Sequence, residues 1–396
     1  MEPHRIALLG AGDFATDAHL PAIAATETIH LAAVYSRSLL SANSFIQATQ
    51  KHASTSHDIT VYSDDPSTEK LDALLARSDI QTVVLALPIT SQPAVIERAW
   101  RAGKNVISEK PVAPSIEEAK GLLGLFEKEF KPKGILWIVA EQMPYIPSFA
   151  KARNFIRNGK IGQLRSFHAE VHIQPSVEAA KTGWRAVPDY QGGFLLDGGV
   201  HFAGALRHIL PYPLTSIFAH SSQIQPHLPP CDTLIGLLTA TPPSLPSQPG
   251  HDNAPTAIAG TFHFTFGIEK PSSTLLYTFR GSTGVMTVDF SGARDHVLKL
   301  VSLPRGELGE EAEEEEEEDP HELTVELPSG GVPDEYEAFG RALIAGAGSQ
   351  EARFVEERSG PRATLRDLAF IEGGLKSSEE RREVDFEEVL GEFWEI

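Results

Sequence analysis

The chain has 396 residues, and its 34 Lys and Arg residues against 54 Asp and Glu residues give a formal net charge of −20. This excess of acid argues against a nucleic-acid-binding protein, because neutralising phosphates requires a basic face. Eleven of the acidic residues lie between Glu307 and Glu322, a stretch without Lys or Arg. Such a run is typical of a solvated loop rather than of a functional surface.

The composition is that of an ordinary globular protein, with 41% hydrophobic residues, and the length suggests about two or three domains. Cys231 is the only cysteine, so an intrachain disulfide is excluded and a reducing compartment fits. No apolar stretch approaches the roughly 18 residues of a membrane span, and the first apolar run is too short for a secretory signal. We therefore expect a cytoplasmic protein that binds neither nucleic acid nor membrane.

The first 143 residues alternate short apolar runs with amphipathic stretches. Five runs rich in Val, Ile and Leu predict buried strands, at Arg5–Leu9, His30–Tyr35, Gln81–Leu87, Asn105–Ile107 and Ile135–Val139. A helix is predicted over Gln92–Ala102, and another begins at Ser115, which forms a capping box with Glu118. Strands that alternate with helices predict an α/β fold, with a doubly wound parallel Rossmann sheet over residues 1–143.

Residues 144–396 show the pattern of an α+β domain. A helix is predicted over Ser148–Arg157, and helices resume at Glu335–Ile344 and Arg362–Leu375. Between them, runs with two-residue alternation predict a mostly antiparallel sheet, at Leu164–Ile173, Ser216–Ser221, Leu234–Thr239, Ile258–Phe266, Thr274–Phe279, Gly284–Asp289 and Val297–Leu303. Flexible insertions are expected at about 241–256, which is rich in proline, and at 306–322.

A glycine-rich motif, G-x-G-x-x-A, follows the first predicted strand and consists of Gly10, Gly12 and Ala15, with Asp13 and Phe14 inside it. The first glycine allows a tight turn, the second lets backbone approach a pyrophosphate, and the alanine allows close packing of helix on strand. Its place at the first strand-to-helix turn predicts a dinucleotide-binding site.

The end of the second strand indicates which dinucleotide binds. Sites for NAD usually carry Asp or Glu there, whereas this chain has Ser36 and Arg37. A serine can donate to a 2′-phosphate and an arginine can pair with it, so we predict NADP(H) over NAD(H). The alternative is that Arg37 is simply a surface arginine in a loop.

Two further stretches carry residues suited to acid–base chemistry. Lys110, followed by Pro111, comes just after a strand, at the carboxyl edge where doubly wound sheets bind ligands. Asp197 and His201 are four residues apart at a predicted helix start, so they share one face of its first turn, where the positive helix end favours a neutral imidazole. A surface lysine, an N-cap aspartate and a helix histidine are the alternatives.

These stretches together resemble the Gfo/Idh/MocA oxidoreductase family, and the resemblance runs over nearly the whole chain. Its motifs are Gly10–Ala15, Ala102–Val106 leading into Glu109–Pro111, Gly159–Gly162, and Asp197-x-Gly199-x-His201. The run Trp184–Pro188 looks like the eukaryotic, chiefly fungal, branch. The resemblance implies a Rossmann domain joined to a domain with a large open sheet, through which such proteins often form dimers or tetramers. It also implies hydride transfer between nicotinamide C4 and a carbonyl or carbinol carbon, usually of a sugar or polyol.

The resemblance further implies roles for individual residues. Lys110 would hydrogen-bond the reacting oxygen, His201 would act as general acid/base, and Asp197 would orient His201 or the substrate. The dinucleotide site would also include Leu87, Pro88 and Glu109, and the substrate pocket would include Tyr145, Trp184 and Arg185. The chain departs from the usual family pattern at Pro144, where an arginine is common, and at Ile89 and Gln92, where Asn and His are common.

No metal site is expected. His168, Glu170 and His172 alternate along one predicted strand, but a straight strand spaces such side chains about 7 Å apart, which is wide for one ion. We interpret them as a polar sheet face at the pocket or at an oligomer interface.

The sequence therefore predicts an NADP(H)-dependent oxidoreductase acting on a small carbonyl or carbinol compound. One alternative is a redox-neutral enzyme that uses the bound cofactor transiently for elimination, epimerisation or glycoside cleavage. The other is a non-catalytic NADP(H)-binding regulator, which would not need Lys110, Asp197 and His201 together.

Overall fold

The computed structural model describes residues 2–52, 58–174, 185–188, 190, 192–241, 257–268, 273–292, 294–302 and 321–394. The predicted insertions fall mostly outside these ranges, at 242–256 and 303–320. The chain forms two compact units. The first comprises Met1–Tyr145, Asp189–Gln191 and Gly330–Leu368, and the second comprises Ile146–Pro188, Gly192–Ser329 and Ala369–Ile396. None of the described helices is long and apolar enough to cross a membrane.

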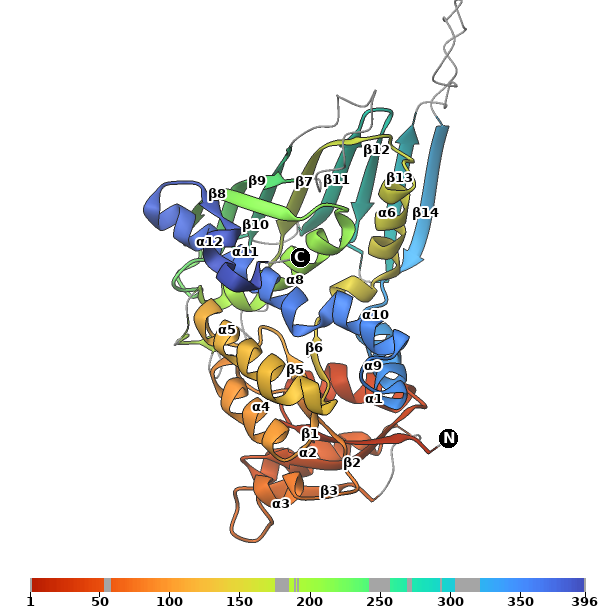
Figure 1. Ribbon diagram of the computed structural model, residues 1–396, viewed down its shortest axis with the longest axis vertical. Coiled ribbons are helices and arrows are strands. Elements are labelled where there is room, and N and C mark those ends of the chain that lie inside the picture. Colours follow the sequence, from red (N-terminus) through yellow and green to blue (C-terminus); the bar gives the residue numbers. More distant parts are fainter. Residues whose placement is uncertain are drawn as a thin grey trace, which may run out of the picture. The chain divides into compact units, whose positions relative to one another are not determined.

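The first unit contains a six-stranded parallel sheet in the order β3-β2-β1-β4-β5-β6 (Figure 1). Its strands are β1 (His4–Leu9), β2 (Ile29–Ser36), β3 (Thr60–Ser63), β4 (Thr82–Leu85), β5 (Asn105–Glu109) and β6 (Trp137–Ala140). The strand order reverses between β1 and β4, which is the topological switch point of a Rossmann fold. The predicted α/β class is confirmed, although β3, which has only four residues, was not predicted.

Helices connect these strands, and their ends follow the predicted signals. The helices are α1 (Leu20–Ala25), α2 (Leu39–Thr49), α3 (Leu71–Leu75), α4 (Gln92–Arg101) and α5 (Ile116–Leu125). The Ser115 side chain caps α5 by accepting from the backbone N–H of Glu118. Gly103 follows α4 with a φ of 75°, the left-handed conformation that ends helices.

The segment Gly330–Leu368 differs from the prediction, which assigned every residue after 143 to the second domain. It returns to the first unit because α9 (Val332–Ala345) packs against α1 and β1, while α10 (Gln350–Ser359) packs against β6. Tyr336 and Phe339 of α9 are fully buried in the same core as Ile6 and Leu8 of β1.

The second unit is built on a nine-stranded sheet in the order β14-β13-β12-β11-β7-β10-β9-β8-β15. Only the β7–β10 pair is parallel, so the predicted, mostly antiparallel sheet is confirmed. The strands are β7 (Leu164–His172), β8 (Leu214–Ser222), β9 (Thr233–Ala240), β10 (Ile258–Thr265), β11 (Thr274–Gly281), β12 (Gly284–Asp289), β13 (Asp295–Ser302), β14 (His321–Pro328) and β15 (Val384–Asp385).

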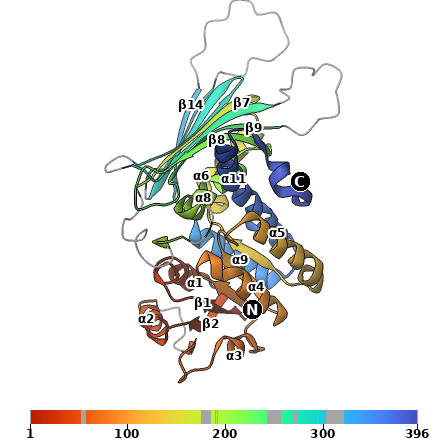
Figure 2. The same ribbon diagram turned by 90° about the vertical axis from the view of Figure 1, so that its left-hand side faces the viewer.

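One face of this sheet carries the helices α6 (Pro147–Arg157), α8 (Gly193–Ile209) and α11 (Pro361–Glu380), as Figure 2 shows. The Phe262 ring of β10 packs edge-on against Phe370 of α11, with ring centroids 4.8 Å apart. Side chains that alternate with this buried set lie on the opposite, open face. Among them, Phe218, Ile235 and Leu237 of β8 and β9 are 48%, 46% and 61% exposed.

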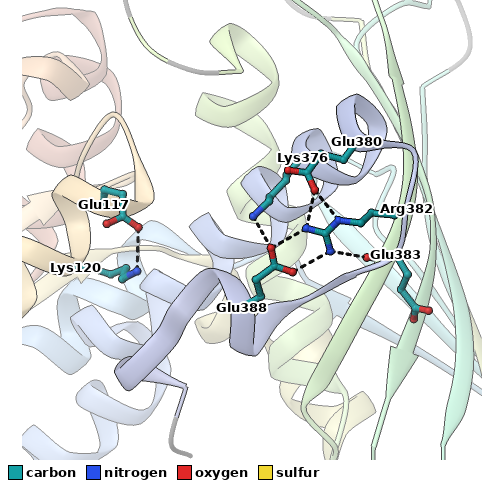
Figure 3. A network of polar contacts seen from close by, with 7 residues as sticks. All are labelled: Glu117, Lys120, Lys376, Glu380, Arg382, Glu383 and Glu388. Carbon is teal, nitrogen blue, oxygen red and sulfur yellow. Dashed lines mark hydrogen bonds and ion pairs between the residues drawn. The ribbon is translucent and has the colours of Figure 1, made fainter.

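At the C-terminal end of the second unit, ion pairs join α11, α12 (Phe386–Leu390) and Arg382, which lies between α11 and β15, as drawn in Figure 3. Glu388 accepts from Lys376 and from Arg382, and Arg382 also pairs with Glu380. Hydrogen bonds from Arg382 and Lys376 lower the pKa of Glu388 to about 2. These contacts hold β15 at the sheet edge beside β8.

Candidate functional site

The glycine-rich loop follows β1, and each of its small residues has a distinct environment. Gly10 has a φ of 107°, and a Cβ there would lie 2.2 Å from the carbonyl oxygen of Ala86. A Cβ on Gly12 would meet nothing within 4 Å. The tight turn therefore needs Gly10, while Gly12 leaves open space for a ligand to approach the backbone. Ala15 is buried, and Asp13 and Phe14 are exposed.

Ser36 is the last residue of β2, and Arg37 follows it with an exposed side chain. The exposed Arg37 side chain is in contact with solvent. The neighbouring Tyr35 donates its hydroxyl to Asp64 over 2.9 Å. Burial and this hydrogen bond raise the pKa of Tyr35 to about 12, so the hydroxyl keeps its proton.

The Lys110 turn begins where β5 ends, and the Lys110–Pro111 peptide bond is cis. The strand runs through Glu109, two residues beyond its predicted end. Gln92, which is fully buried at the start of α4, donates its side-chain amide to the Pro111 carbonyl over 3.1 Å. Leu87 and Pro88 follow β4, the strand beside β5, and so lie at the same edge of the sheet.

Asp197 and His201 lie on α8, but not at its start. The helix begins at Gly193, so both residues lie beyond the first turn and Asp197 is not its N-cap. The prediction that the positive helix end acts on the His201 imidazole is therefore wrong, because the electrostatic effect of a helix end falls off within one turn. Instead, Arg185 donates from Nε to Oδ2 of the buried Asp197 over 2.6 Å.

Arg185, one of the three predicted substrate residues, thus contacts Asp197, whereas Tyr145 lies in a core. Tyr145 is only 9% exposed, and its hydroxyl lies 2.7 Å from Ser359 Oγ in the core of the first unit. Its ring also packs edge-on against Phe339, so in this structure the side chain serves packing rather than lining an open pocket. Trp184 lies outside the described residues.

The polar side chains of β7 continue onto β10. Glu170 Oε1 lies 3.5 Å from His172 Nδ1, and His172 Nε2 lies 3.3 Å from His263 Nδ1. His168 is farther away, with Nε2 3.9 Å from Glu170 Oε2. Across the part of the chain that the structure describes, no group of three His, Cys, Asp or Glu residues is arranged to hold a metal ion.

The structure also contains a buried polar cluster beside the Lys110 turn that the sequence did not indicate. His19, Tyr336 and Glu335 join Glu109 there, and His19 and Tyr336 are 317 residues apart in the chain. A histidine within the apolar run around Leu20 is the only local signal, and it does not identify a partner.

Comparison with known families agrees with this arrangement. A family model described as an oxidoreductase family with an NAD-binding Rossmann fold matches residues 4–132, and the GFO/IDH/MocA C-terminal domain matches residues 149–300. The chain belongs to the Gfo/Idh/MocA oxidoreductase family.

Among Gfo/Idh/MocA proteins and other relatives, the dehydrogenase FPY6 of Fusarium mangiferae is 33% identical over 381 residues, 94% of this chain and 96% of that protein. The protein YMR315W of Saccharomyces cerevisiae is 26% identical over 384 residues, 96% of this chain and 97% of that protein. These relatives fit the predicted fungal branch. The dTDP-3,4-didehydro-2,6-dideoxy-alpha-D-glucose 3-reductase of Actinomadura kijaniata is 28% identical over 282 residues, 71% of this chain and 73% of that enzyme.

Solved structures share the Gfo/Idh/MocA fold. An oxidoreductase from Thermotoga maritima matches with a TM-score of 0.74 and 23% identity, over 98% of this chain and 100% of that chain. The 3-ketoreductase KijD10 from Actinomadura kijaniata matches with a TM-score of 0.69 and 23% identity, over 95% of this chain and 98% of that chain.

Proposed function

We propose that this chain is an NADP(H)-dependent oxidoreductase that transfers a hydride between the nicotinamide and a carbonyl or carbinol carbon of a small molecule. One observation carries the proposal. The glycine-rich loop after β1, Arg37 after β2 and Lys110 after β5 all lie at the carboxyl edge of one parallel sheet. In doubly wound folds this edge binds the ligand.

The residues present suit NADP(H). Gly12 leaves room for the pyrophosphate beside the backbone, with Gly10, Asp13, Phe14 and Ala15 completing the loop. Ser36 and Arg37 would receive the 2′-phosphate, and no carboxylate stands at these two positions to repel it. In support, the 3-ketoreductase KijD10 was solved in complex with NADP.

Bound NADP(H) supplies or accepts the hydride, and the side chains of this chain manage the oxygen and its proton. The Lys110 ammonium donates a hydrogen bond to the reacting oxygen and stabilises its negative charge. His201 exchanges the hydroxyl proton as general acid/base. Asp197, held by Arg185, positions the substrate or the imidazole. Glu109, Leu87 and Pro88 frame the nicotinamide end of the site.

The substrate we propose is a sugar, a polyol or another small aldehyde or ketone, bordered by Arg185. Support comes from the sequence relatives that are 3-reductases of a dTDP-linked deoxysugar.

We also infer a homodimer or homotetramer paired through the open face of the nine-stranded sheet. Phe218, Ile235 and Leu237 expose adjacent apolar side chains on that face, because Phe218 and Leu237 are register partners on β8 and β9. Exposed apolar patches of this kind mark association surfaces. Cytoplasmic location stays a prediction.

A substrate panel tests the function. Aldoses, polyols, aromatic aldehydes and ketones are assayed at about 340 nm in both directions, with NADP(H) and with NAD(H). We expect steady, NADP(H)-dependent absorbance change that Lys110→Met and His201→Ala abolish. Product formation without net NADPH change would favour the redox-neutral alternative. A biological activity that survives both substitutions would favour the regulator.

A further inference from the structure

We propose that His19 is a positioning residue, which ties the glycine-rich loop to the Lys110 turn through Glu109 and is itself oriented by Tyr336. The imidazole is fully buried. Its Nδ1 lies 2.6 Å from the Tyr336 hydroxyl. Its Nε2 lies 3.0 Å from Glu109 Oε1, at ion-pair distance although outside strict hydrogen-bond geometry.

The topology explains why such a bridge matters. Strands β1 and β5 are not neighbours, since β4 lies between them. No ladder hydrogen bond therefore fixes the loop after β1 relative to the turn after β5. His19 ends the π-helical turn Ala15–His19 that follows the glycine-rich loop, and Glu109 is the last residue of β5. Their contact spans the intervening strand.

The bridge also reaches the exposed tip of the glycine-rich loop. The Phe14 ring packs edge-on against the His19 ring, with centroids 5.2 Å apart. Phe14 precedes the π-helical turn directly, and the Thr16 hydroxyl donates to the Gly12 carbonyl over 3.1 Å. A change in the imidazole position is thus transmitted to the residues that would meet the pyrophosphate.

The polar contacts from Tyr336 through His19 to Glu109 can share one donor-to-acceptor direction. Tyr336 is fully buried, and burial raises the pKa of its hydroxyl, so the phenol keeps its proton and can serve as the hydrogen-bond donor to Nδ1. With Nδ1 as the acceptor, the ring N–H lies at Nε2, which is 3.0 Å from Glu109 Oε1. Tyr336 in this way selects the tautomer that binds Glu109.

Glu109 directly precedes Lys110. Holding the Glu109 carboxylate in place therefore also fixes the backbone position from which the Lys110 side chain extends. Gln92 holds the other side of the same turn at the Pro111 carbonyl. This inference rests on the proposed function, because Lys110 is there the group that meets the reacting oxygen. The consequence is that dinucleotide affinity and turnover depend on one buried imidazole that touches neither cofactor nor substrate.

The test uses three variants and one matched control of the full chain. His19→Leu removes both polar contacts, whereas His19→Gln keeps an amide donor for Glu109. Tyr336→Phe removes only the hydroxyl that selects the tautomer. Thr82→Val is the control, because it deletes another buried hydroxyl bonded to a histidine, 2.8 Å from His4 Nε2, at the amino end of the same sheet.

The readouts are the NADPH dissociation constant from fluorescence titration, which needs no substrate, and kcat and KM for a substrate identified by the panel. His19→Leu is expected to weaken NADPH binding and lower kcat by about tenfold or more, and Tyr336→Phe by about threefold or more. The NADPH dissociation constant and kcat of His19→Gln should stay within about threefold of the wild-type values, and those of Thr82→Val should equal the wild-type values. Substrate KM should change little in all four variants.

The outcomes separate the two proposals. If wild type binds NADPH and turns over while His19→Leu and Tyr336→Phe bind it equally well, the bridge is overturned and the proposed function stands. If thermal melting shows His19→Leu to be unfolded, Tyr336→Phe and His19→Gln decide by the same criteria. If wild-type protein binds no NADPH, both proposals are overturned.

Discussion

Arg185 Nε donates to Oδ2 of Asp197 over 2.6 Å, although Arg185 lies outside α8 and Asp197 lies in its interior. The Asp197 side chain is 6% exposed, whereas that of Arg185 is 35% exposed. A nearly buried carboxylate thus has its charge balanced by a cation that still reaches solvent. Asp197 is therefore neither a helix cap nor a surface acid.

Replacing Arg185 with Ala removes one charged partner of this buried carboxylate. We expect the free energy of unfolding to fall by roughly 1–3 kcal/mol, because losing a charge-assisted hydrogen bond leaves more of the desolvation cost of the carboxylate uncompensated. Urea denaturation measures the change, with Arg165→Ala on β7, an exposed arginine, as control. A stability loss equal to that of the control would show that the pair contributes nothing.

Replacing Arg37 with Ala should discriminate between the two nicotinamide cofactors. We expect the NADPH dissociation constant to rise about 10-fold to 100-fold, because a charge-assisted contact to the 2′-phosphate is lost, while NADH binding is unchanged. Fluorescence titrations of both cofactors provide the measurement. Arg101→Ala, which removes an exposed arginine paired with Glu97, is the control. Equal weakening of both cofactors would place Arg37 away from the phosphate.

The two glycines of the loop should fail in different ways when changed to alanine. Gly10→Ala meets the Ala86 carbonyl at a positive φ, so we expect a loss of stability of about 2 kcal/mol or more. Gly12→Ala meets no protein atom, so it should melt like wild type yet bind NADPH poorly. Thermal melting with and without NADPH separates the two effects. Wild-type NADPH affinity in Gly12→Ala would argue that the cofactor binds elsewhere.

Glu335 should make stability depend on pH. Burial, followed by the negative charges of Glu109 and Glu141, raises its pKa well above the usual value of 4.5. The folded protein thus keeps a proton that the unfolded chain releases above about pH 4.5, and the associated stability is lost as pH rises toward the raised pKa.

Glu335→Gln removes this linkage, so its free energy of unfolding should fall less than that of wild type between about pH 5 and pH 9. Urea denaturation across that range provides the measurement. Glu337→Gln, on the exposed side of the same helix, should keep the wild-type slope. Parallel curves for wild type and Glu335→Gln would mean that Glu335 is ionised in the folded protein.

Local patterns in the sequence were sufficient for the parts of the fold that local chemistry determines. The apolar runs of β1, β2 and β5, the Ser115 cap and the turn at Gly103 all depend on residues close together in the chain. The strand β14 was not predicted. It lies at the sheet edge, and Glu322, Thr324 and Glu326 are exposed. Its sequence therefore resembles a continuation of the preceding acidic run.

Contacts between distant segments could not be predicted in the same way. Nothing near Tyr336 indicates that its hydroxyl meets His19, 317 residues earlier, because that contact arises only when α9 returns to the first unit. For Tyr145 the sequence suggested one role, and the contacts with distant segments indicate another. Its sequence position suggested a pocket residue, but the packing of α9 and α10 encloses it. Residue type and spacing identify candidate chemistry, whereas burial decides which candidates are available for it.

The most direct test of the central claim is to follow the hydride itself. NADPH carrying deuterium at nicotinamide C4 is incubated with the enzyme and the best carbonyl substrate from the panel, and the product is analysed by mass spectrometry and NMR. We predict one deuterium on the new carbinol carbon for each NADPH oxidised, with no transfer by Lys110→Met. Product that forms without deuterium, or without net NADPH oxidation, would contradict the claim that this chain is an NADP(H)-dependent oxidoreductase.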